Sequence, residues 1–205
     1  GGWFRKEIKA VGDLNGLKMR IAGIAGQVFA KLGVVPQQIA GGDIYPALEK
    51  GTIDAAEWIG PYDDAKLGFN RVAPFYYYPG WWEGALNLSF YVAKPKHDEL
   101  PPAYREVLES ACRDATLETM AKYDAQNPQA LRQLVAAGTQ LRAFPREVLQ
   151  ASYRASQELF AELGEQNPRF KRIHEQWDRF RTEQVQWARV TDDTLANFLA
   201  VATAQ

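Results

Sequence analysis

The stretch GLKMRIAGIAGQVFAKLGVVPQQIAGGDIYPALEKGTIDAAEWIGP, residues 16–61, decides the fold class. Its pieces alternate between two patterns, strand-like or extended at 17–24, 34–39 and 52–60 and helical at 27–33 and 44–51. We expect Gly33 and Gly51 to end the two helices and Asp43 to cap the start of the second. Strand, helix, strand, helix, strand is the order typical of an α/β lobe.

The chain beyond this stretch becomes mainly helical. Residues 75–93 are predicted to be extended, interrupted by a Pro-Gly pair and continued by the strand-like ALNLSFYVAK. A helix is predicted over 101–137, and Pro128 should kink or break it near Asn127. The remaining predicted elements are a short strand over 139–144, helices over 146–163 and 168–190, and a last helix capped by Thr191.

Composition limits the classes of function. The 205 residues are 46% apolar, so the chain can bury a substantial core. The 24 Lys and Arg residues balance 25 Asp and Glu residues without a polybasic run, which argues against nucleic acid or an anionic membrane surface as partner. Cys112 is the single cysteine, and no apolar run is long enough for a membrane span. We expect a soluble globular chain, with any export signal outside it.

Motifs for common enzyme classes are missing from the sequence. The Gly-rich pieces GIAG and AGGD match neither a dinucleotide fingerprint nor a P-loop, and no G-x-S-x-G is present. His97 and His174 stand in charged surroundings without metal-ligand spacing. Nucleotide binding, histidine-based metal binding and nucleophilic hydrolysis are therefore disfavoured.

The stretch FYYYPGWWEG, residues 75–84, gathers six aromatic rings beside Glu83. Rings with O–H and N–H groups combine apolar bodies with polar tips that can hold a small polar molecule. Glu57 also stands next to a Trp, and paired carboxylates among aromatic rings occur in glycoside hydrolases. A carbohydrate-active hydrolase or sugar-binding module using Glu57 and Glu83 therefore remains an alternative.

Two further features each have two interpretations. Arg20 ends the strand-like LKMR among apolar neighbours, so it is either a solvent-facing strand residue or a guanidinium aimed at an anion. The helix over 168–190 carries Trp177, Phe180 and Trp187 among several Arg residues. This composition suits either a subunit interface or packing against the chain's own body.

The motifs of the first third resemble a known family. Four pieces match in order and spacing, at residues 16–20, 32–36, 45–51 and 54–61. They resemble the signature of the periplasmic solute-binding subunits, of the DctP type, of tripartite ATP-independent periplasmic (TRAP) transporters. The aromatic WIGPYDD and YYYPGWWEG resemble the branch that binds 2-oxo or 2-hydroxy monocarboxylates such as pyruvate or lactate. The resemblance implies a binding protein and not an enzyme.

The resemblance also implies roles for individual residues. Arg20 would bind the ligand carboxylate through its planar fork, and Trp58, where many sugar-acid binders have Asn, would make the pocket small. The other implied ligand-binding residues are Tyr78, Trp81 and Trp82, with Gln27 and Gln38 as further polar contacts.

A metal cation beside the ligand is a further implication. Glu83 and the carbonyl of Trp82 would hold it, with sodium the first expectation and calcium the second. A lone carboxylate among rings needs a counter-charge, although a hydrogen bond from Trp58 or a nearby Tyr would also serve.

The expected architecture is a two-lobed α/β periplasmic binding protein with an interlobe cleft and long C-terminal helices. We expect the N-terminal lobe to be partly missing from the chain, and the protein to deliver its ligand to membrane subunits. The predicted parts are a second-lobe α/β part over 1–80, a hinge strand and long shared helix over 81–135, a return to the second lobe over 136–167, and a dimerising helical tail over 168–205.

Overall fold

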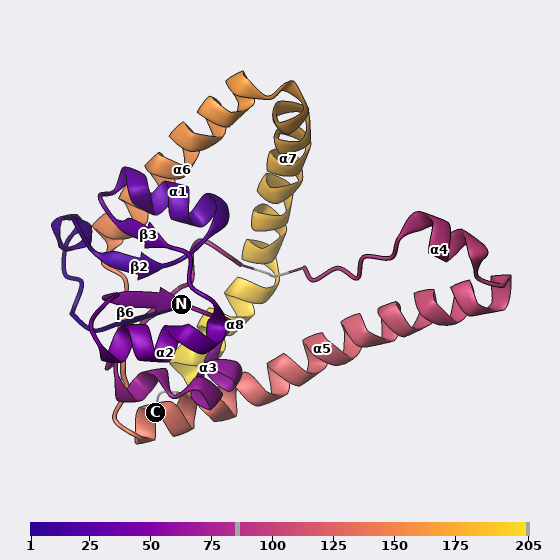
Figure 1. Cartoon of the computed structure of the whole chain (residues 1–205). Helices are drawn as coiled ribbons and strands as arrows, with labels where there is room; N and C mark the ends of the chain where they lie inside the picture. Colours follow the sequence, from indigo (N-terminus) through magenta and orange to yellow (C-terminus); the bar gives the residue numbers. More distant parts are fainter. Residues whose placement is uncertain (85–86, 204–205) are drawn as a thin grey trace. The chain divides into compact units, whose positions relative to one another are not determined.

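The alternating stretch at residues 16–61 builds one half of a six-stranded sheet (Figure 1). The structure is a computed structural model and describes residues 1–84 and 87–203. The strands are β1 (Gly2–Phe4), β2 (Lys18–Arg20), β3 (Val35–Gln37), β4 (Ala55–Glu57), β5 (Phe75–Tyr78) and β6 (Gln140–Ala143), in the order β3-β2-β4-β1-β5-β6. The predicted α/β class is confirmed.

The strand directions bring five carboxyl ends to one edge of the sheet. Strand β2 is parallel to β3 and β4, β6 is parallel to β5, and β1 alone runs antiparallel to its two neighbours. Arg20, Gln37, Glu57 and Tyr78 are the last residues of their strands and therefore share this edge. In open α/β sheets ligands bind outside the carboxyl ends of the strands.

The helices follow the predicted order closely. They are α1 (Gly23–Lys31), α2 (Gly41–Glu49), α3 (Pro61–Leu67), α4 (Lys94–Glu99), α5 (Pro102–Ala136), α6 (Arg146–Gln166), α7 (Pro168–Val190) and α8 (Asp192–Ala202), with 3-10 turns at Val11–Leu14 and Phe69–Arg71. Gly33 and Gly51 follow the ends of α1 and α2 with φ of +88° and +72°, as expected for glycine. The Asp43 prediction is wrong, because α2 begins earlier and Ala40 occupies the N-cap position.

Each face of the sheet carries its own apolar core. Successive side chains of a strand point to opposite faces. Trp3 and Tyr76 accordingly join the core that includes Ile44 of α2, whereas Phe4 and Tyr77 join the other core. The first core also takes Leu48, Ile53, Ala56, Phe69, Ala73 and Leu134, and the second takes Ile8, Leu14, Leu17, Met19, Ile21, Phe29, Val34, Ala55, Phe144 and Val148.

In the middle of the chain the described residues show neither the predicted strand after β5 nor the predicted helix break at Pro128. The described part of ALNLSFYVAK before α4, residues 87–93, is neither helix nor strand, and residues 85 and 86 lie outside the described part. A strand needs a neighbouring strand, and none of the described strands pairs with this segment.

Helix α5 also runs unbroken through Pro128. The buried Leu134 fixes the helix to the first core beyond the proline, and the Asn127 side chain accepts a hydrogen bond from the Tyr62 amide at 3.0 Å. These contacts offset the hydrogen bond that proline cannot donate.

The chain divides into two compact units, Gly1–Ser152 and Tyr153–Gln205. In the second unit Asn167 caps α7, its side chain accepting from the amides of Arg169 and Phe170 at 3.0 and 3.1 Å. Thr191 stands at the start of α8, but its hydroxyl donates to the Trp187 carbonyl and does not cap the helix.

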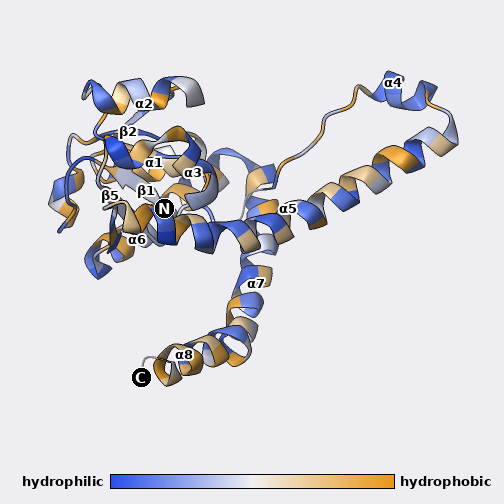
Figure 2. Cartoon of the chain, turned by 90° about the horizontal axis from the view of Figure 1, so that it is seen from below, coloured by the Kyte–Doolittle hydropathy of each residue, from blue (hydrophilic) through white to orange (hydrophobic). Residues whose placement is uncertain are grey.

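Several helices carry apolar residues among hydrophilic ones along their lengths (Figure 2). Exposed large apolar side chains include Tyr104, Val107, Leu117 and Met120 of α5 and Ile173, Trp177, Phe180 and Trp187 of α7. None of the helices in the described residues is long and apolar enough to cross a membrane.

Candidate functional site

Arg20 lies at the carboxyl edge of the sheet and is held there by several acceptors. Its Nε donates to the Ile39 carbonyl at 3.3 Å and its Nη1 to the Glu57 carbonyl at 2.9 Å, and Nη1 also pairs with the Glu57 carboxylate. Its side chain is 17% exposed. The solvent-facing interpretation of Arg20 is therefore wrong. Among the described residues Nη2 has no hydrogen-bond partner, which leaves one side of the guanidinium for an anion.

The Trp58 ring lies beside Arg20. The Arg20 guanidinium carbon is 5.1 Å from the ring centroid, within the range of a cation–π contact. The ring also packs against Gly41 at the start of α2, where a Cβ would lie 2.5 Å from Cη2 of the indole. Gly41 therefore permits the Trp58 position, and Trp58 in turn covers the guanidinium.

We predict that Gly41→Ala weakens ligand binding. The added methyl would push the Trp58 ring away from Arg20, because the backbone on the other side of the contact belongs to α2 and cannot give way easily. Overpacking of this kind costs about 1–3 kcal/mol. Gly42→Ala is the matched control, since nothing lies within 4 Å of its Cβ position. Thermal unfolding and ligand titration of both variants test this, and equal behaviour would contradict the packing role of Gly41.

The acidic partner of Arg20, Glu57, lies within electrostatic reach of two further carboxylates. Burial raises the pKa of Glu57, and the nearby charges of Glu83 and Asp64 raise it further, whereas Arg20 opposes the shift. Glu57 is thus the ion-pair partner of Arg20. Glu83 is exposed, in the turn after β5. No group of three or more His, Cys, Asp or Glu side chains suited to a metal ion occurs within residues 1–84 and 87–203.

Two of the predicted pocket tryptophans, Trp81 and Trp82, pack against the second core, which contains Phe29. Trp81 and Trp82 stack at a tilt on Phe29 of α1, with centroids 4.9 and 5.5 Å away, and Trp82 also contacts Phe144. Both are partly buried, and the buried Nε1 of Trp81 has no partner in the described part of the chain. Tyr78 is 48% exposed at the end of β5. These three residues share the sheet edge with Arg20, but no described contact joins them to Trp58.

Two rings of the aromatic stretch at residues 75–84 belong to the interior of the fold. Tyr76 and Tyr77 are buried, one in each core. The Tyr77 hydroxyl donates to the Ile8 carbonyl and accepts from the Ile8 amide. Burial raises the pKa of Tyr76, and the neighbouring Asp64 reinforces this effect. The polar tips of these two rings serve the interior of the fold.

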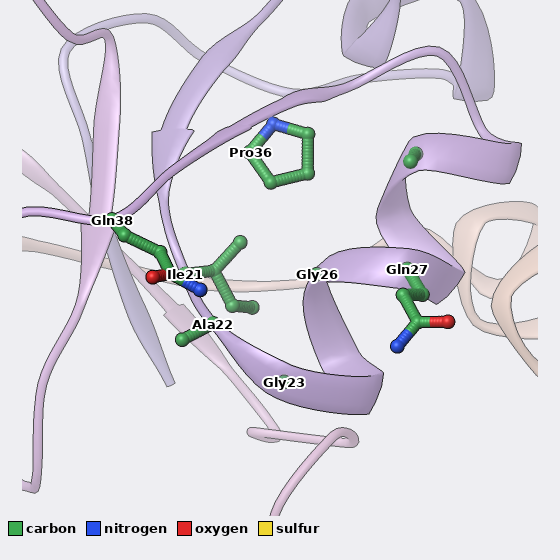
Figure 3. A pocket seen from close by; sticks show the side chains of 8 residues that line it. Ile21, Ala22, Gly23, Gly26, Gln27, Pro36 and Gln38 are labelled. Carbon is green, nitrogen blue, oxygen red and sulfur yellow. The ribbon is translucent and has the colours of Figure 1, made fainter.

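Gln27 and Gln38 both line a hollow with a volume of about 340 Å³ (Figure 3). Figure 3 shows Gln38 reaching across toward Ile21 and Ala22, with Gln27 on the facing helix α1. The lining residues are Ile21, Ala22, Gly23, Gly26, Gln27, Ala30, Pro36 and Gln38. Both amides are exposed at its rim. Arg20 is not among the lining residues, so the two glutamines form a separate polar patch beside it.

Sequence reasoning missed Asp64, which is 1% exposed. Its carboxylate accepts from the amides of Ile59 and Gly60, both at 3.1 Å, from Nε1 of Trp3 at 2.9 Å and from the hydroxyl of Tyr76 at 3.0 Å. Burial raises the pKa of Asp64, and the hydrogen bonds oppose that shift. Its position in the first turn of a helix that begins at Pro61 was the available signal, but the adjacent Asp63 carries the same signal.

An α/β sheet with a guanidinium and an indole at its carboxyl edge is the arrangement of a ligand-binding lobe. The profile of DctP, the bacterial extracellular solute-binding proteins of family 7, matches residues 1–167. The chain belongs to this family. The family consists of solute-binding proteins, and the comparisons give no support to the hydrolase alternative.

The chain is similar to a curated relative and to solved structures. It is 48% identical over 198 residues to the monocarboxylate 2-oxoacid-binding periplasmic protein of Nostoc sp., covering 97% of this chain and 54% of the relative. A TRAP transporter solute-binding protein from Bordetella bronchiseptica is 56% identical, with a TM-score of 0.91. The match covers 100% of this chain and 62% of that protein. That structure is described as a mixed-occupancy dimer with copurified calcium and picolinate in one active site and an apo site.

A second solved structure, a TRAP periplasmic solute-binding protein from Pseudoalteromonas atlantica, is 38% identical with a TM-score of 0.91. The match covers 96% of this chain and 60% of that protein, whose structure contains bound sodium and pyruvate. The chain thus spans between 54% and 62% of these relatives.

Proposed function

We propose that the protein containing this chain is a periplasmic solute-binding protein for a small monocarboxylate. The ligand would be a 2-oxo acid such as pyruvate or a 2-hydroxy acid such as lactate. The protein would pass it to the membrane subunits of a TRAP transporter for secondary active uptake. Family membership and the pyruvate and picolinate in similar structures support this assignment.

The observation that carries the proposal is the state of Arg20. Its Nε and Nη1 are fixed by Ile39 and Glu57, so the orientation of the guanidinium is set before a ligand arrives. A carboxylate on the Nη2 side would form charge-assisted hydrogen bonds with a group whose ordering entropy has already been lost. Preorganisation of this kind suits a receptor that must bind a small ligand tightly.

The other proposed ligand contacts come from residues at the same edge. Trp58 beside Arg20 restricts the room near the carboxylate and thereby favours short acids. Tyr78, Trp81 and Trp82 offer apolar surface with polar tips, and Gln27 and Gln38 offer amide groups at the neighbouring hollow.

The charges at this edge support a bound cation, sodium or calcium. Glu57 already balances Arg20, and Glu83 and Asp64 add further negative charge within electrostatic reach of Glu57. A carboxylate ligand would raise the negative excess, so a cation held by Glu83 and the Trp82 carbonyl would offset it. Calcium and sodium in similar structures support this proposal.

We further propose a second lobe outside the chain, because the relatives are longer. Residues 1–80 and 136–167 would then belong to one lobe, and 81–135 would supply the hinge segment and a helix shared with the other. Closure of the two lobes on the ligand would stabilise the bound state.

The tail over 168–205 is proposed to form a homodimer. The exposed Trp177, Phe180 and Trp187 support this, since aromatic residues are enriched in subunit interfaces. A dimer is also recorded for the Bordetella bronchiseptica structure. Sedimentation equilibrium of the intact protein should give twice the mass of one subunit, and a monomer at micromolar concentration would contradict the proposal.

Isothermal titration calorimetry of the intact protein with pyruvate, a longer 2-oxo acid and lactate tests the function. We expect saturable one-site binding to at least one acid, with the acid recovered unchanged after incubation. Chemical conversion of the acid, or binding of sugars in preference to all three acids, would overturn the proposal.

A further inference from the structure

The buried carboxylate of Asp64 is the strongest feature that the proposed function does not use. It lies in α3, away from any solvent contact, and all four of its described hydrogen bonds come from donors on other segments or on the loop before α3. An ionised carboxylate accepts about four hydrogen bonds in full, so this group is saturated.

Two of the four donors belong to the loop after β4, and the other two belong to the strands β1 and β5. Ile59 and Gly60 directly follow Trp58 in the loop after β4. Tyr76 lies in β5, two residues before Tyr78, and Trp3 lies in β1 between β4 and β5. The Trp3 and Tyr76 rings stack at 4.1 Å with an interplanar angle of 14°. One carboxylate therefore ties the loop after β4 to the neighbouring strands β1 and β5.

We propose that Asp64 is a positioning residue for the ligand site, holding the loop over residues 58–60 so that the Trp58 ring covers Arg20. This inference rests on the proposed function wherever it uses ligand affinity as a measurement. Because Trp58 directly precedes the Ile59 amide that Asp64 binds, loss of that bond frees the backbone on the C-terminal side of Trp58. The Trp58 ring itself contacts Gly41, Arg20 and the first core.

Asp64→Asn in the intact protein is the direct test. The amide has one acceptor oxygen where the carboxylate has two, and its N–H groups cannot replace an acceptor for the Trp3 indole or for the Ile59 and Gly60 amides, which only donate; the Tyr76 hydroxyl alone can also accept. We expect the Kd for pyruvate to rise at least tenfold at a temperature well below the unfolding midpoint. Hydrogen exchange of the Ile59 and Gly60 amides should accelerate in the ligand-free variant.

Leu134→Ala is the matched control. Leu134 is buried in the core that contains Trp3 and Tyr76, but it lies on α5 and takes part in none of the four hydrogen bonds of Asp64. It should lower the unfolding temperature without changing the exchange of the Ile59 and Gly60 amides and with less than a twofold change in Kd. This control separates a positioning role from general loss of stability.

Tyr76→Phe keeps the proposal testable if Asp64→Asn does not fold. It removes one donor and retains the ring on Trp3, and we expect a Kd about threefold higher with faster exchange at Ile59 and Gly60. Unchanged exchange at these amides in a folded variant would overturn the inference whatever the ligand. Failure of the wild-type protein to bind any acid would instead overturn the proposed function, and the exchange measurement would still decide the role of Asp64.

Discussion

Arg20→Ala should reduce the affinity for pyruvate by roughly 100-fold or more. Hydrogen bonds to charged groups contribute about 1.5–3 kcal/mol each, and a carboxylate facing Nη2 would lose at least one such bond together with the cationic charge. Each 1.4 kcal/mol corresponds to about a tenfold change in Kd. Calorimetric titration of the intact protein measures this loss.

Three further variants make the Arg20 experiment specific. Lys18→Ala removes an exposed cation from the same strand and should bind as the wild type does. Arg20→Lys keeps the charge without the planar fork and should give an intermediate affinity. Arg20→Ala leaves the Glu57 carboxylate unpaired and partly buried. The double variant Arg20→Ala/Glu57→Gln should therefore regain thermal stability but not pyruvate affinity. Wild-type affinity in Arg20→Ala would contradict the proposed role.

Removal of the cation should weaken pyruvate binding by about tenfold or more. Two negative groups, Glu83 and the ligand carboxylate, would then face each other without a counter-charge, and like charges near a surface interact by several kcal/mol at an effective dielectric constant of about 20. Titration after chelation and exhaustive dialysis against a sodium-free buffer tests this. Sodium or calcium should restore the affinity.

Glu83→Gln should abolish the response to added cation. The amide oxygen is a weaker ligand than a carboxylate and carries no charge to balance. Glu118→Gln, an exposed acid on α5, serves as the control and should respond as the wild type does. If chelation leaves the wild-type affinity unchanged, the cation proposal is wrong, and Glu83 would then contact the ligand or a neighbouring ring directly.

Much of the fold could be predicted from residues 16–61, because hydrophobic periods and glycine positions are local signals. Gly33 and Gly51 end helices with positive φ as expected, since only the backbone of the turn decides this. The Asp43 error is a local shift of the helix start, whereas two other errors arose where distant contacts decide the outcome. Helix α5 passes Pro128 with the support of Asn127 and Leu134, and residues 87–93 lack a strand to pair with in the described chain.

The candidate site was predictable only in part. Arg20 could be singled out because a cation at the end of an apolar strand is unusual, but its pairing with Glu57 depends on strand order. The row of aromatic residues did not reveal which rings are internal. Alternation along β5 buries Tyr76 and Tyr77 on opposite faces, and this follows only once both faces of the sheet are covered. Asp64 was missed because its four donors come from distant or irregular segments.

The most direct measurement is a crystal structure of the intact protein with pyruvate and calcium. The account predicts the pyruvate carboxylate within hydrogen-bond distance of Nη2 of Arg20, with the Trp58 ring beside it. It also predicts the cation bound to the Glu83 carboxylate. Pyruvate bound elsewhere, with Arg20 contacting only Ile39 and Glu57, would contradict the central claim that this arginine receives the ligand.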